Sequence, residues 1–96
     1  MKKREIPALR AKLTEYVEAK IADGWEIVPG WTYDRGKRQC CPMGAVTDDR
    51  WVTGAGEILG LDFQEIISFI HGFDRKRPEN NHMYRLGIEF RERYAP

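Results

Sequence analysis

Residues that start and stop helices recur at short intervals along this chain of 96 residues. Gly24, Gly60 and Gly72 suit positions at or just past a helix end, whereas Pro42 suits a first helical turn. This spacing predicts a mainly α fold: a small helical domain with a helix-turn-helix-like corner and a short β-ribbon after the first helix.

The first predicted helix is the stretch "IPALRAKLTEYVEAKIADGW", which carries Pro7 in its first turn and ends before Gly24. Apolar side chains recur in it at helical spacing and predict one buried face. The residues of that face are Leu9, Leu13, Tyr16, Val17 and Ile21.

Strand-forming residues follow between Trp25 and Val28, and "WTYDRGKRQC" then predicts a small hairpin with Gly36 at positive φ in its turn. Trp31 and Tyr33 lie beside this basic turn. Such aromatics stack on nucleic-acid bases in some proteins, but more often they cover one side of a hairpin.

Three further helical segments are expected. The first spans residues 47–59, weakened by its glycines, and Gly60 ends it. The next runs from 62 to 72, with Asp62 as cap and Glu65 reaching back to it. Asn80 or Asn81 caps the last helix, "HMYRLGIEFRERY".

Composition supports one soluble domain covering residues 1–96. Hydrophobic residues make up 42% of the chain and charged residues 32%, with a net charge of only +1. No apolar run approaches the ~20 residues that a membrane span needs, and no secretory signal is evident. Without a disulfide framework, we expect a cytoplasmic protein that has no membrane association.

Cys40 and Cys41 are adjacent, in "QCCPMGAV". A thiol at a helix N-terminus can be activated, and zinc could recruit both cysteines with His71 and His82. The adjacent pair lacks the spacing of zinc ligands, however, and no residue places a base beside it. We expect two buried structural thiols, with no catalytic residue, metal site or cofactor.

The stretch "GEILGLDFQEIISFIHG" resembles the helix-turn-helix of the lambda-repressor-like family. Gly56 stands where that motif has a small residue, and Gly60 stands at its turn. Ile66 and Phe69 match two apolar positions of the second helix, and Gly72 closes the motif. The resemblance implies a DNA-binding regulator that contacts DNA through Gln64, Ser68, His71 and Arg75.

The same helix favours a protein partner more strongly. Asp62 and Glu65 would bring negative charge towards phosphates. Apolar residues also cover most of the helix, more than one buried face needs. We therefore predict a small, non-catalytic binding or regulatory protein that acts through a protein–protein interface or self-association. Its expected contact residues are Phe63, Ile67 and Ile70, and nucleic acid is the alternative partner.

Overall fold

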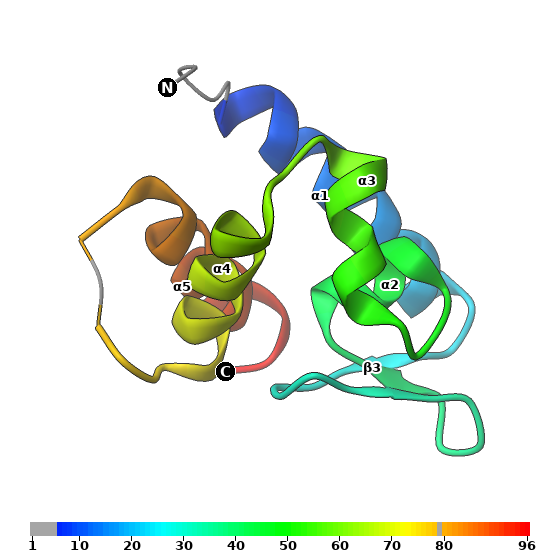
Figure 1. Ribbon diagram of the computed structural model, residues 1–96. Coiled ribbons are helices and arrows are strands. Elements are labelled where there is room, and N and C mark those ends of the chain that lie inside the picture. Colours follow the sequence, from blue (N-terminus) through cyan, green and yellow to red (C-terminus); the bar gives the residue numbers. More distant parts are fainter. Residues whose placement is uncertain (1–5, 79) are drawn as a thin grey trace.

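The computed structural model describes residues 6–78 and 80–96. Its helices are α1 (Ile6–Ala22), α2 (Pro42–Thr47), a 3-10 turn η1 (Val52–Gly54), α3 (Ala55–Leu59), α4 (Phe63–Asp74) and α5 (His82–Tyr94). Three two-residue strands lie between α1 and α2: β1 (Glu26–Ile27), β2 (Tyr33–Asp34) and β3 (Gln39–Cys40). The mainly α class predicted from the sequence is confirmed (Figure 1).

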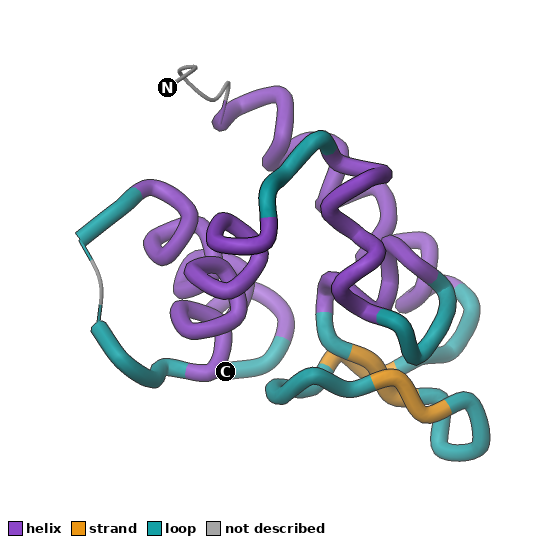
Figure 2. Tube along the Cα trace, viewed as in Figure 1, coloured by secondary structure: helices purple, strands orange, loops and turns teal. Residues whose placement is uncertain are grey.

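The β-ribbon is a three-stranded sheet with the order β1–β3–β2. β2 and β3 form the expected antiparallel hairpin, and β1 pairs with β3 in parallel. Figure 2 shows this sheet at one edge of the molecule, beside α2. The positive φ predicted for Gly36 is wrong: within the hairpin turn Arg38 has that conformation, at φ 53°.

The helix predicted over residues 47–59 is shorter than expected, because after Thr47 only η1 and α3, from Val52 to Leu59, are helical. Pro42 opens α2 as expected, but the helix already ends at Thr47, where Asp48 adopts a left-handed φ of 52°. Asp49 then accepts a hydrogen bond from the backbone N–H of Trp51. This local bond favours a turn over helix continuation, so α2 and α3 are separate elements.

The turn between α3 and α4 agrees with the prediction from the sequence. Gly60 caps α3 at φ 72°, and its N–H bonds the carbonyl of Gly56. Asp62 and Glu65 form the predicted capping box at the start of α4. α4 runs to Asp74, two residues beyond the predicted end, because Gly72 lies inside the helix and Arg75 takes the left-handed cap.

α4 and α5 pack side by side on one side of the molecule, and α1 to α3 and the sheet form the other (Figure 1). The two glycines at the α4–α5 contact permit a very close approach: a Cβ on Gly72 would overlap the carbonyl oxygen of Tyr84, and one on Gly87 that of Phe69.

One apolar core joins the two sides, reaching from Leu13 and Val17 of α1 to Phe73 and Phe90. Ile21, expected on the buried face of α1, is exposed, and Tyr16 is half-buried. Asn81 caps α5 as predicted. No helix in the described part of the chain is long and apolar enough to cross a membrane.

Candidate functional site

The three residues expected to contact a partner on α4 have different surroundings. Phe63, in the first turn, is 62% exposed, and Ile67 is half-buried. Ile70 is fully buried in the core, so in this structure its side chain offers no surface to a partner, and its role in binding stays a prediction. The apolar stripe that includes Ile70 faces the core because α5 packs closely on α4.

The residues proposed to contact DNA also differ in their exposure. Gln64 and Arg75 are exposed and His71 is half-buried. Ser68 is only 4% exposed, and its hydroxyl oxygen lies 3.4 Å from the donating side-chain nitrogen of Asn81. Ser68 therefore cannot reach a base edge without leaving the α4–α5 contact. The resemblance to a helix-turn-helix stays a prediction.

The cysteine pair lies in the core. Both thiols are free and buried, and the Cys41 sulfur accepts a hydrogen bond from the Gly44 N–H at 3.4 Å. Burial raises the pKa of Cys40 to about 12. Burial also raises the pKa of Cys41, against the lowering effect of its backbone hydrogen bonds. Neither thiol has the exposure or the lowered pKa of a nucleophile.

No group of three or more histidine, cysteine or carboxylate side chains within residues 6–78 and 80–96 could hold a metal ion. A polar cluster lies where α1, the sheet and the loop after α2 meet. The Tyr33 hydroxyl donates to the Asp48 carboxylate at 2.8 Å, and Lys20 Nζ donates to the same oxygen. These two hydrogen bonds lower the pKa of Asp48.

Contacts with the ring of Trp25 and with the ammonium group of Lys20 hold the ring of Tyr33 in place. Its ring centroid lies 5.2 Å from that of Trp25. Lys20 Nζ lies 4.3 Å from the Trp25 ring and 5.9 Å from the Tyr33 ring, within the range of cation–π attraction. Tyr33 is therefore fixed at both its ring and its hydroxyl.

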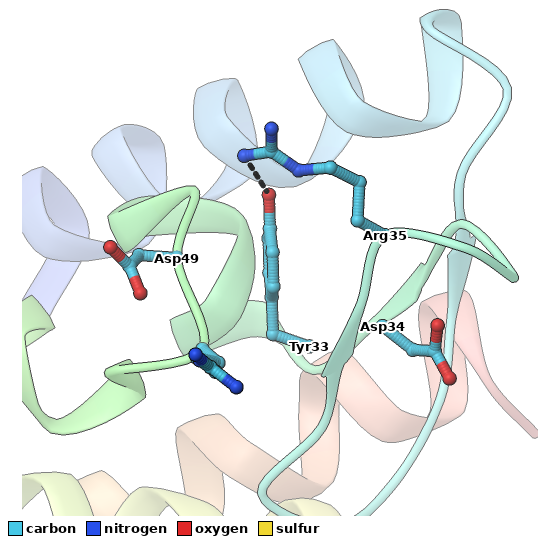
Figure 3. Close-up of a pocket in the computed structure, with 5 residues that line it drawn as sticks. Tyr33, Asp34, Arg35 and Asp49 are labelled. Atoms are coloured by element: carbon cyan, nitrogen blue, oxygen red, sulfur yellow. Dashed lines mark hydrogen bonds between the residues drawn. The ribbon is translucent and has the colours of Figure 1, made fainter.

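A surface hollow of about 370 Å³ lies beside this cluster. Its lining comes from the hairpin and from the loop after α2: Tyr33, Asp34, Arg35, Asp49 and Arg50. Figure 3 shows the Arg35 guanidinium meeting the Tyr33 hydroxyl, with Asp49 and Asp34 on opposite sides of the tyrosine. The Arg35 N–H donates to that hydroxyl at 3.2 Å, and this bond raises the pKa of Arg35.

Side chain-to-backbone bonds fix the two loops that form the hollow. The Asp34 carboxylate accepts from the Lys37 N–H at 3.0 Å, across the hairpin turn. The Asp49 carboxylate accepts from the Trp51 N–H at 3.1 Å. Both carboxylates thus shape their own loops, as aspartates in turns commonly do.

The guanidiniums of the two arginines in the hollow make few interactions within the molecule. Among the described residues, neither Arg35 nor Arg50 forms an ion pair, and the Arg50 guanidinium makes no hydrogen bond. Trp51 follows Arg50 directly and is 75% exposed. We call the combination of Tyr33, Arg35, Arg50 and Trp51 the hairpin–loop surface.

The sequence indicated only half of this surface. Tyr33 and the basic hairpin turn stood out as an aromatic and charged combination. Arg50 and Trp51, in contrast, lay inside a segment that the pattern assigned to a helix. The "DDRW" sequence, two turn-forming aspartates before a tryptophan, is the signal that favours an exposed loop there.

Comparisons with models of protein families, with curated proteins and with solved structures found no match.

Proposed function

We propose that this chain is a non-catalytic protein-binding domain, and that the hairpin–loop surface is its principal contact. The observation that carries the proposal is the exposure of Trp51, which directly follows Arg50 in the chain, while Arg50 lines the hollow with Tyr33 and Arg35. Tryptophan, tyrosine and arginine are the residue types that dominate interface hot spots. An exposed indole also leaves apolar surface that a partner would remove from water.

Preorganisation supports the proposal. The ring and hydroxyl of Tyr33 are held by Trp25, Lys20 and Asp48. Side chains that are already fixed lose little conformational entropy when a partner docks, so more of the contact energy becomes affinity. The buried thiols support a binding role over cysteine-dependent catalysis, and their unpaired state supports a reducing compartment such as the cytoplasm.

The start of α4 is the second surface on which a protein partner or a second copy of the chain could dock. Phe63 and Ile58 are both exposed, one on either side of the turn that joins α3 to α4. The two surfaces predict different effects of mutation. The contact is at the hairpin–loop surface if binding depends on Trp51, and at α4 if it depends on Phe63.

Selection from a random-peptide display library against the immobilised full chain tests the proposal. Selected peptides should bind Trp51→Ala at least about tenfold more weakly than wild type, as expected for a hot-spot tryptophan. Ile21→Ala removes an exposed apolar residue of α1 and should change nothing. Peptides that tolerate Trp51→Ala but lose affinity for Phe63→Ala would move the interface to α4. Failure to enrich any peptide would contradict the proposal.

A further inference from the structure

We infer that the hairpin–loop surface recognises an extended acidic peptide segment, whose carboxylates are held by the open guanidiniums of Arg35 and Arg50. This inference rests on the proposed protein-binding function and names the chemistry of the partner. It follows from three features of the surface: which charges are already engaged, how Arg35 is held, and how the charges balance around the hollow.

Asp34, Asp49 and Arg35 each make a hydrogen bond within the molecule, and Arg50 makes none within the described part of the chain. Asp34 and Asp49 each accept a hydrogen bond from a backbone N–H of their own loop, and Figure 3 shows the Asp34 carboxylate pointing away from Tyr33. The guanidiniums of Arg35 and Arg50 form no ion pair within the described part of the chain. The planar fork of an arginine matches a carboxylate with two parallel N–H donors.

Arg35 is also oriented before any ligand arrives. Its guanidinium donates to the Tyr33 hydroxyl and lies 6.0 Å from the tyrosine ring. The same hydroxyl donates its proton to Asp48, which Lys20 holds from α1. One guanidinium N–H is thus used for positioning, and a guanidinium has five donors, so others remain for a ligand.

The charge balance favours a segment with a few carboxylates over a nucleic-acid backbone. Two arginines and two aspartates line the hollow, so its formal charge is zero. A nucleic-acid backbone carries a negative charge at every nucleotide, which a hollow of zero formal charge does not balance. An extended peptide can place single carboxylates against the two guanidiniums and an apolar side chain against Trp51.

Fluorescence anisotropy with the full chain tests the inference. The probe is a labelled peptide in which glutamates alternate with glycines around one phenylalanine. The matched probe has glutamine in place of every glutamate. The glutamate probe should bind at least about tenfold more tightly than the glutamine probe, and Arg35→Gln or Arg50→Gln should each remove about tenfold of that affinity.

Two variants sharpen the result. Arg35→Lys keeps the charge but loses the fork, so we expect a loss smaller than that of Arg35→Gln. Arg93→Gln removes an exposed arginine of α5 and should bind as wild type does. If Arg93→Gln lost as much affinity as Arg35→Gln, binding would depend only on the net charge of the protein. That result would contradict the assigned site.

The remaining outcomes separate this inference from the function on which it rests. If the two probes bind equally, or the glutamate probe does not bind, the acidic partner is wrong. The protein-binding function would still stand if library peptides lose affinity for Trp51→Ala. If oligothymidylate binds more tightly than the glutamate probe, with a steep salt dependence, both proposals are overturned in favour of nucleic acid.

Discussion

At the scale of single residues, Gly72 and Gly87 set how closely α4 and α5 approach. A Cβ at Gly87 would overlap the backbone of Phe69 and Phe73, which cannot rotate away as a side chain can. We expect Gly87→Ala to lower the free energy of unfolding by about 1–3 kcal/mol, the usual range for overpacking. Urea denaturation measures the change.

Gly36→Ala is the control for that prediction. Its added Cβ would come no closer than 3.4 Å to the nearest neighbouring side-chain oxygen, and the residue has no positive φ. This variant should unfold at nearly the wild-type urea concentration. If Gly87→Ala were as stable as Gly36→Ala, the close approach of the two helices would be contradicted.

A second residue-scale prediction concerns the buried Cys40 thiol. Its pKa of about 12 in the folded chain exceeds the ordinary value of 9.0, so the unfolded chain loses this proton first. The stabilisation is complete below about pH 9 and is lost as pH rises towards about 12. Cys40→Ala should make the fall in the free energy of unfolding above pH 9 shallower by roughly 1 kcal/mol per pH unit.

Urea denaturation at about pH 8 and about pH 10 measures that slope in both chains. Lysines and tyrosines also titrate in this window, and the difference between wild type and variant removes their contribution. An unchanged slope would indicate that the thiol is already solvated in the folded chain. Slow alkylation of the folded protein by iodoacetamide at neutral pH is the companion expectation.

At the scale of elements, Gly60 ends α3 through its backbone conformation alone. It has a φ of 72°, and nothing lies within 4 Å of an added Cβ. We therefore expect Gly60→Val to destabilise the chain by more than about 1 kcal/mol, whereas Gly60→Asn should cost less because asparagine tolerates the left-handed region. Thermal melts of both variants test this prediction. Equal melting temperatures for Gly60→Val and Gly60→Asn would contradict it.

The elements best predicted from the sequence are those whose signals are local. Asp62 and Glu65 are three residues apart, and this spacing alone specifies the capping box. The loop after Thr47 was missed because the helical interpretation of residues 47–59 gave too little weight to the two turn-forming aspartates, Asp48 and Asp49. The parallel pairing of β1 with β3 joins Ile27 to Cys40, a contact that hydrophobic periodicity does not encode.

The candidate site was predicted less well for the same reason. Tyr33 meets Asp48 and Lys20 only because the sheet, α2 and α1 converge. The expected contacts on α4 depended on how much of that helix α5 covers. The burial of Ile70 was not foreseen, because the α4 sequence does not reveal how closely α5 approaches at Gly87.

At the scale of the whole molecule, one core should make the chain unfold as one unit. Phe90 of α5 is fully buried and belongs to the same apolar cluster as Leu13 of α1. Phe90→Ala should lower the free energy of unfolding by about 3–5 kcal/mol. The three tryptophans all lie within residues 25–51, so their fluorescence reports on that part of the chain. Tryptophan fluorescence and far-UV circular dichroism should give the same unfolding midpoint. Two separate midpoints would indicate that α4 and α5 form a unit of their own.

The central claim is that the hairpin–loop surface is where this protein binds its partner. Titrating the isotope-labelled full chain with the tightest library peptide, followed by amide and indole NMR shifts, tests it most directly. The account predicts that the Trp51 indole and the amides of Arg35 and Arg50 shift most. The largest shifts at Phe63 and Ile67, with Trp51 unmoved, would contradict it.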